Sequence, residues 1–296
     1  MMIYIFLRGI LMGIADSIPG ISGGTIAIIV GIYERLVTAI SHCDVTAAVQ
    51  FFTGRWVALA KRTDAIFLLT LLSGIATGII SSITLVHFLL TNYLPVTFAA
   101  FAGLVLGSVW ILFWEIKSRN LFTYLAMILG AVAAYGIVSL DAISGSEQLG
   151  YVFGCGMIAI CAMILPGISG AYVLLILGEY AIITSKVKEV AHLNIIPADL
   201  LVLVVFACGC VLGLVAFSKF LRWLLAHWHG MTMAVLCGFM LGSLKSLYPF
   251  QKMLDVKDFV ALPPEAITTA LCVQVALALV GGLALVLGLH WLASRN

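Results

Sequence analysis

Long apolar runs occupy most of the chain. A helix that spans a membrane needs about 20 consecutive apolar residues, and six runs come close to or exceed that length. They cover residues 65–91, 96–116, 121–139, 198–225, 230–247 and 267–292. The pattern therefore predicts six transmembrane helices.

Two further apolar stretches, 3–39 and 149–185, are each interrupted near the middle by a Pro-Gly pair. The first arms, 3–15 and 149–165, are short for a full crossing. Helix ends at membrane depth are tolerated where the backbone is covered by protein or lines a cavity. The sequence therefore predicts two broken or re-entrant helices.

The interrupted stretches are copies of one another. Residues 15–33 align without gaps on 162–180 with nine identities in nineteen positions, and 74–108 align on 209–243 with ten identities. We therefore expect an all-α integral membrane protein of two homologous repeats, 1–140 and 148–296, in a single transmembrane domain. Each repeat has a broken helical hairpin followed by three transmembrane helices.

Two topologies fit this duplication. If each hairpin re-enters on one side, each repeat crosses three times and the second repeat is inverted, as in many transporters. If both hairpins cross, all the basic loops face the cytoplasm, which the positive-inside rule favours. Because the first arms are short, we favour the inverted arrangement.

Four pairs of glycines have the GxxxG spacing that lets helices approach closely in lipid. They are Gly74 and Gly78, Gly103 and Gly107, Gly209 and Gly213, and Gly238 and Gly242. We expect these glycines to serve helix packing.

Residues 41–64 combine aromatic side chains with Arg55, Lys61 and Arg62. This composition is typical of a short amphipathic helix that lies on the membrane surface. We expect it at the cytoplasmic face.

Composition supports a membrane protein and excludes other classes. Hydrophobic residues make up 63% of the 296 residues and charged residues 9%, against about 25% charged in soluble domains. A net charge of +2 with no basic tail argues against nucleic-acid binding. The seven cysteines lack metal-ligand spacing, so we expect neither metal nor cofactor. The N-terminal segment is repeated later in the chain, which argues against a cleaved signal peptide.

The hairpins carry the candidate binding chemistry. A turn that precedes a helix leaves backbone N–H groups unpaired and directs a partial positive charge at the break, which favours phosphate or carboxylate. The candidate substrate-binding residues there are Ser22, Gly23, Gly24 and Thr25, with Ser169, Gly170 and Tyr172 in the second repeat. An isolated Pro-Gly break can simply kink a helix, but paired breaks favour a transporter site.

Four basic residues are candidates to neutralise a bound anion: Arg35, Lys219, Arg222 and Lys245. Lys219 and Arg222 share one helix face. For Arg222 and Lys245 the alternative is snorkelling toward the interface.

Asp16 and Glu34 are candidates for coupling to a proton or cation gradient. An ionised carboxylate inside an apolar stretch needs a partner or a proton, so Asp16 is the stronger candidate. Its alternatives are a helix cap or a partner for Arg8. Glu34 and Arg35 lie near an interface, where simple solvation is the alternative.

The string GIADSIPGISGGTIAIIVGIYERL, with AMILPGISGAYVLLILG and GFMLGSLKSLYPF, resembles the bacterial polyprenyl-phosphate transporter family over nearly the whole chain. The resemblance implies recycling of undecaprenyl phosphate, the carrier lipid of envelope polymers, across the cytoplasmic membrane. It marks Asp16, Pro19, Gly20, Ser22, Gly23, Gly24, Thr25, Tyr33 and Glu34, and then Pro166, Gly167, Ser169, Gly170 and Tyr172. The resemblance therefore implies a multi-pass flippase of the inner membrane.

Three other functions remain open. Helix termini at broken segments also suit a small-anion channel or exchanger. A membrane phosphatase would need a nucleophile with its base or clustered carboxylates, and no such group is found, so no residue is assigned a catalytic role. A scaffold has no need of helix ends at membrane depth.

Overall fold

A computed structural model of the chain describes residues 2–17, 22–116, 119–193, 196–255 and 258–293. The described residues form thirteen α-helices, with two short 3₁₀ helices and one β-hairpin between α12 and α13. They are α1 (Met2–Asp16), α2 (Gly23–Ile29), α3 (Tyr33–Ser41), α4 (Val45–Phe52), α5 (Trp56–Arg62), α6 (Ala65–Asn92), α7 (Leu94–Glu115), α8 (Leu121–Val138), α9 (Leu149–Ile164), α10 (Gly170–Ile176), α11 (Tyr180–Ala191), α12 (Pro197–Ser243), η1 (Leu244–Leu247), β1 (Gln251–Asp255), β2 (Asp258–Ala261), η2 (Pro264–Ala266) and α13 (Thr269–Ala293).

Among the described residues, five helices are long and apolar enough to cross a membrane: α6, α7, α8, α12 and α13. The chain is thus an all-α, multi-pass membrane protein, as expected. The two predicted helices 198–225 and 230–247 correspond to the two segments of α12, which are separated by a break at Trp228, where φ is −134° and ψ is 49° and the backbone is not helical.

Both interrupted stretches break where the sequence predicts. In the first, α1 ends at Asp16 and α2 begins at Gly23, while Pro19 and Gly20 lie outside the described residues. Each stretch also breaks a second time, after α2 and after α10. Gly31 (φ 68°) and Gly178 (φ 73°) occupy those breaks, in a conformation that favours glycine. Between α10 and α11 the chain turns by 113°.

The four GxxxG pairs lie at helix–helix contacts, which confirms their expected role. A Cβ on any of these glycines would meet atoms of a neighbouring helix. The neighbours are Phe6 and Ile10 of α1 for Gly74 and Gly78, Leu279, Leu283 and Val286 of α13 for Gly103 and Gly107, Phe153, Met157 and Ile160 of α9 for Gly209 and Gly213, and Met127, Ala131, Ala134 and Tyr135 of α8 for Gly238 and Gly242.

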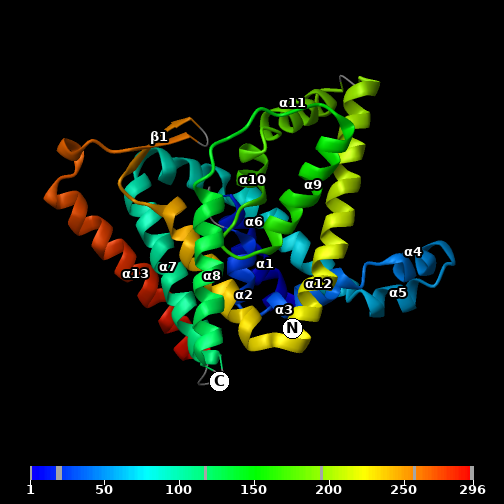
Figure 1. Cartoon of the computed structure of the whole chain (residues 1–296), viewed down its shortest axis with the longest axis horizontal. Helices are drawn as coiled ribbons and strands as arrows, with labels where there is room; N and C mark the ends of the chain where they lie inside the picture. The colour runs from blue at the N-terminus through cyan, green and yellow to red at the C-terminus, as the bar shows by residue number, and fades with distance from the viewer. Residues whose placement is uncertain (1, 18–21, 117–118, 194–195, 256–257, 294–296) are drawn as a thin grey trace.

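Helix pairing crosses between the repeats. Within each repeat, the first hairpin helix packs along the first long helix: α1 on α6, and α9 on residues 197–227 of α12. The following helices exchange partners, because α7 packs on α13 while residues 229–243 of α12 pack on α8. Helix α8, from the first half of the chain, therefore packs against the second half, and α13, from the second half, packs against the first (Figure 1).

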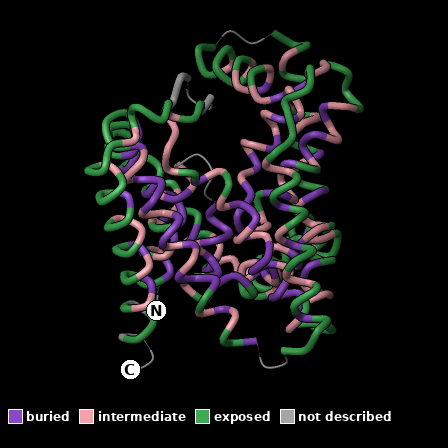
Figure 2. Tube along the Cα trace, turned by 60° about the vertical axis from the view of Figure 1, so that its left-hand side comes forward, coloured by how far each residue is buried: buried purple, intermediate pink, exposed green. Residues whose placement is uncertain are grey.

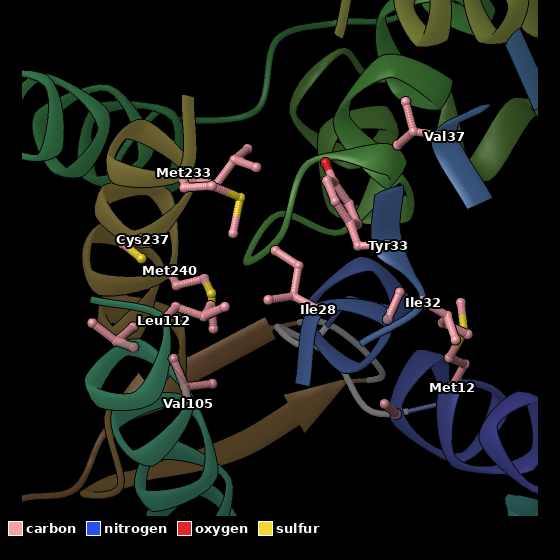
Figure 3. Packing of buried hydrophobic residues seen from close by; sticks show 14 of the residues in the cluster. Met12, Ile28, Ile32, Tyr33, Val37, Val105, Leu112, Met233, Cys237 and Met240 are labelled. Carbon is pink, nitrogen blue, oxygen red and sulfur yellow. The ribbon is translucent and has the colours of Figure 1, made fainter. Parts of the chain in front are cut away.

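The main hydrophobic core surrounds α2. Figure 3 shows Ile28 of α2 between Met12 of α1 on one side and Leu112 of α7 with Met240 of α12 on the other. Buried positions gather at the middle of the molecule and exposed ones on its periphery and ends (Figure 2). The outer faces carry many exposed large hydrophobic side chains, as a lipid-facing surface requires.

Residues 41–64 form two short helices, α4 and α5, which project from the bundle (Figure 1). Phe52 is 86% exposed and Val57 71% exposed, while Lys61 and Arg62 lie in the last turn of α5. The sequence indicated one amphipathic helix, and the structure divides it at Gly54, whose φ is 71°. The hairpin of β1 and β2 was not predicted.

Candidate functional site

The two hairpins meet directly at the start of α2. Thr25, which is 1% exposed, accepts a hydrogen bond through Oγ1 from the backbone N–H of Gly167 at 2.8 Å. The Ser22 hydroxyl lies 3.3 Å from the carbonyl of Met163 and 3.4 Å from that of Leu165, and donates toward them. Side chains of the first motif thus bind backbone of the second.

Two more contacts close this surface. The Tyr33 hydroxyl donates to the carbonyl of Ile164 at 3.1 Å. A Cβ on Gly24 would lie 2.9 Å from the same carbonyl oxygen, so a larger residue there would separate the motifs. We call this contact, formed by Ser22–Thr25 and Tyr33 with residues 163–167, the hairpin interface.

Asp16, at the end of α1, caps the start of α2. Its Oδ1 accepts a hydrogen bond from the N–H of Gly23 at 2.6 Å, while the Ser22 hydroxyl accepts from the N–H of Gly24 at 3.1 Å. The N–H of Thr25 bonds the carbonyl of Ser22. The start of α2 is therefore satisfied by protein groups, with a carboxylate at its positive end, which matches the helix-cap alternative for Asp16.

The second hairpin begins differently. Ser169 is the N-cap of α10, but its side chain makes no capping hydrogen bond. Gly170 is buried against the carbonyl of Ala159. The Tyr172 hydroxyl donates to the carbonyl of Val138 of α8 at 2.9 Å. Of the candidate residues in this repeat, Ser169 and Gly170 therefore lie at the helix start.

Three of the four candidate cations gather around α3 and α4 instead of the hairpin interface. Arg35 pairs with Asp64 at 2.7 Å and lies over the Phe67 ring. Lys219 pairs with Asp44 at 3.3 Å, and Arg222 bonds His42. His42 and Asp44 lie between α3 and α4, and Arg35, His42 and Asp64 line one pocket, so these cations form one cluster there.

Of the three cations in the cluster, Arg35 and Lys219 pair with carboxylates, whereas Arg222 bonds a histidine. Burial, reinforced by the Arg222 guanidinium, lowers the pKa of His42, so this partner is neutral. Asp44 is the opposite case: burial raises its pKa, but hydrogen bonds, above all from Arg62, outweigh that and lower the pKa to about 2.

The two remaining candidates lie elsewhere. Glu34 pairs with His229 at 2.8 Å, and both side chains are 58% exposed, which is consistent with a solvated surface pair. Lys245 donates to the Ser139 hydroxyl and lies over the Tyr135 ring, beside the end of α8. It is not part of the cation cluster.

An apolar cavity of about 520 Å³ adjoins the hairpin interface. Its lining comes from α8, from both segments of α12 and from Leu165 of the second hairpin. The lining residues are Phe122, Leu125, Ala126, Leu129, Leu165, Phe217, Phe220, Leu221, Leu224, Trp228, Met231, Thr232, Val235, Leu236 and Phe239. Phe122 is 65% exposed and Leu129 68% exposed, so the cavity opens on the outer surface of the bundle.

Sequence reasoning missed two parts of this site. The carbonyls of residues 163–165 are backbone atoms and leave no residue signature. The cavity has one in retrospect, because Phe217, Leu221, Leu224 and Trp228 follow a helical period, but in a membrane chain such a stripe looks like any lipid-facing surface.

Comparison with known proteins identifies the family of the chain. A model of the family described as undecaprenyl phosphate translocase-like matches residues 12–259. The chain belongs to this family. A polyprenyl-phosphate transporter of Vibrio cholerae is 38% identical over 84% of the chain and 79% of its own length. One from Staphylococcus aureus is 31% identical over 86% of the chain and 89% of its own. No solved structure matches the chain.

Proposed function

We propose that the chain is a flippase that recycles a polyprenyl phosphate, of the undecaprenyl phosphate class, across the bacterial cytoplasmic membrane. The physical problem is to keep a charged phosphate out of hydrocarbon while its long apolar tail stays in lipid. A suitable protein needs a polar passage beside an apolar groove that opens to the bilayer.

The observation that carries the proposal is the apolar cavity beside the hairpin interface. Leu165 lines the cavity, and its carbonyl faces the Ser22 hydroxyl, so one residue borders both environments. Thr232 is the one residue with an aliphatic hydroxyl among those that line the cavity. An isoprenoid tail is a fitting occupant, whereas a small inorganic anion has no use for such a lining.

For the headgroup we propose contact at the hairpin interface, through Ser22–Thr25 and the start of α10. Since Asp16 already occupies the N-terminus of α2, the phosphate must displace that carboxylate or bind Ser169 and Gly170 first. Among the cations of the cluster we propose Arg222 for the phosphate, because its bonded partner, His42, is neutral and leaves its charge unmatched.

We further propose that the repeats are inverted and work by alternating access. In support, α8 ascends in Figure 1 while its counterpart α13 descends. Each outer helix packs on a helix of the other repeat, so movement of one hairpin relative to the other would rearrange both sides of the bundle. We propose Asp16 and Glu34 as the coupling residues. For Asp16 the reason is that its carboxylate and the phosphate of the lipid would compete for the backbone N–H of Gly23.

The test is an assay of undecaprenyl phosphate transport in proteoliposomes, in which the distribution of the lipid between the two leaflets is measured over time. Replacement of Ala126, which lines the cavity, by tryptophan should slow transport strongly. Ala133→Trp, at an exposed position of the same helix, should leave it unchanged. Equal rates for both variants would contradict a tail in this cavity.

The rival is a small-anion channel or exchanger that uses the same helix termini. A competition experiment separates the two functions. Inorganic phosphate in large excess should compete poorly with the lipid if the tail contributes to binding. Efficient competition, together with flux of phosphate through Ala126→Trp, would favour the rival.

A further inference from the structure

Residues 42–64, which connect α3 to α6, leave the bundle and form an arm (Figure 1). We call these residues the arm. Its two helices, α4 and α5, pack chiefly on each other, and α5 also packs on α6. At eight and seven residues they are about 12 and 10 Å long, too short to cross a hydrocarbon layer of about 30 Å. The arm is therefore not a membrane span, and it contributes no residue to the main hydrophobic core.

The second repeat makes the corresponding connection without an arm. There α11 ends at Ala191 and α12 begins at Pro197, so residues 192–196 stand where the first repeat has residues 42–64. Since one copy of the duplicated fold joins the hairpin to its long helix without an arm, the fold itself does not require one. The arm therefore points to a separate role at this end of the first repeat.

The tip of the arm exposes large apolar side chains. Phe52, Trp56 and Val57 are each more than half exposed. Phe51 packs edge-on against Phe52 and against Trp56, with ring centroids 5.5 and 4.7 Å apart, so the three rings form one aromatic cluster beside the turn at Gly54. Contiguous exposed apolar surface marks a contact with a protein or a membrane, and Trp and Phe are typical of segments that lie in the membrane interface.

Both acidic residues of the arm lie at its base, where ion pairs hold them. Asp44 pairs with Arg62 of α5 at 2.9 Å and with Lys219 of α12 at 3.3 Å. Asp64, the residue before α6, pairs with Arg35 of α3 at 2.7 Å. The arm is thus linked to α3 and to α12, and its negative charges are neutralised there.

Two cations of the arm stay unpaired. Arg55 is exposed in the turn between α4 and α5, directly before Trp56, and Lys61 is exposed in the last turn of α5. Neither has an ion-pair partner among the residues that the structure describes. The exposed surface of the arm therefore combines apolar rings with unmatched positive charge.

We propose that the arm is an interfacial anchor that binds anionic phospholipid. Phe52, Trp56 and Val57 insert among the acyl chains at the level of the headgroups, and Arg55 and Lys61 bind lipid phosphates. A negatively charged membrane surface complements both the rings and the cations, and it is always within reach of a chain that spans the membrane. Because ion pairs link the arm to α3 and α12, the anchor holds these helices at one face of the bilayer. The proposal concerns lipid binding and does not depend on transport.

The first test measures contact between the arm and lipid in the full-length protein. It uses nanodiscs of phosphatidylcholine and phosphatidylglycerol, one of which is brominated, because bromine quenches tryptophan fluorescence on contact. The difference between wild type and Trp56→Phe isolates the signal of Trp56. Both brominated lipids should quench Trp56, and phosphatidylglycerol should do so more strongly at the same mole fraction. Absence of quenching by either lipid would overturn the proposal, since the arm would then face water or another protein chain.

The second test asks whether the two cations select the lipid. One cation near an anionic surface strengthens binding about fivefold, so Arg55→Gln and Lys61→Gln should each lower the preference of Trp56 for phosphatidylglycerol by about that factor. Added salt should weaken the preference by screening. Lys188→Gln, which removes an exposed cation of α11, should leave it unchanged. Equal quenching of the wild type by the two lipids, or a preference that survives loss of both cations, would overturn the proposal.

Discussion

Replacement of Thr25 by valine tests the hairpin interface most directly. Valine keeps the branched shape of threonine but removes Oγ1, the acceptor of the 2.8 Å hydrogen bond from Gly167. Because Thr25 is 1% exposed, water cannot replace the lost acceptor without a structural change. The N–H of Gly167 would be left buried and unpaired.

The cost follows from that orphaned donor. Leaving a buried N–H without a partner costs about 1–3 kcal/mol, which corresponds to a roughly 5- to 150-fold shift in the equilibrium for opening the interface. The other bonds across the interface remain, so the effect should be local separation of the hairpins and not loss of the fold.

Hydrogen exchange of the peptide that contains residues 165–168 measures this opening. Thr25→Val should accelerate its exchange by the factor above, and Thr77→Val is the matched control. Thr77 is exposed on α6 and bonds only its own helix, through the carbonyl of Ser73. Unchanged exchange in Thr25→Val, or equal acceleration in the control, would refute the interface as a specific hydrogen-bonded contact.

Three further outcomes are expected. Gly282→Ala should lower the melting temperature measured in detergent, since the added Cβ would collide with the Ala100 carbonyl at a cost of about 1–3 kcal/mol. The control Gly281→Ala, whose added Cβ meets nothing within 4 Å, should leave the melting temperature unchanged. Since the folded-state pKa of Asp44 is lowered to about 2, the stability that its ion pairs contribute is complete above about pH 4 and is lost as pH falls toward 2. Fluorescence of Trp56 in α5 should report the loss of these ion pairs, and Asp44→Asn should abolish the transition. Arg222→Gln should slow lipid transport in proteoliposomes with little change in melting temperature, and a wild-type rate would exclude Arg222 from headgroup binding.

Much of the fold follows from apolar run length and internal similarity. The predicted runs 65–91 and 121–139 differ from α6 and α8 by one residue at most, because a lipid-spanning helix has little freedom in length. The first break of each hairpin was predictable from its Pro-Gly pair. The glycine pairs were predictable as contacts, although their partner helices were not.

The candidate site was harder to predict, for physical reasons. Arg35 and Lys219 pair with carboxylates that are distant in sequence, and such pairing depends on tertiary structure. Asp16 was identified as chemically important, but its bond to the N–H of Gly23, seven residues later, depends on tertiary structure.

The exchange of partners between the repeats has a consequence for biogenesis. When α7 leaves the ribosome, the helix on which it packs, α13, begins more than 150 residues later in the chain. Until then the Gly103 face of α7 is open to lipid or to a chaperone. We expect the two halves, expressed as separate chains divided within residues 139–148, to be degraded individually and to assemble when produced together. An ancestral single repeat would, by the same logic, have been an obligate dimer.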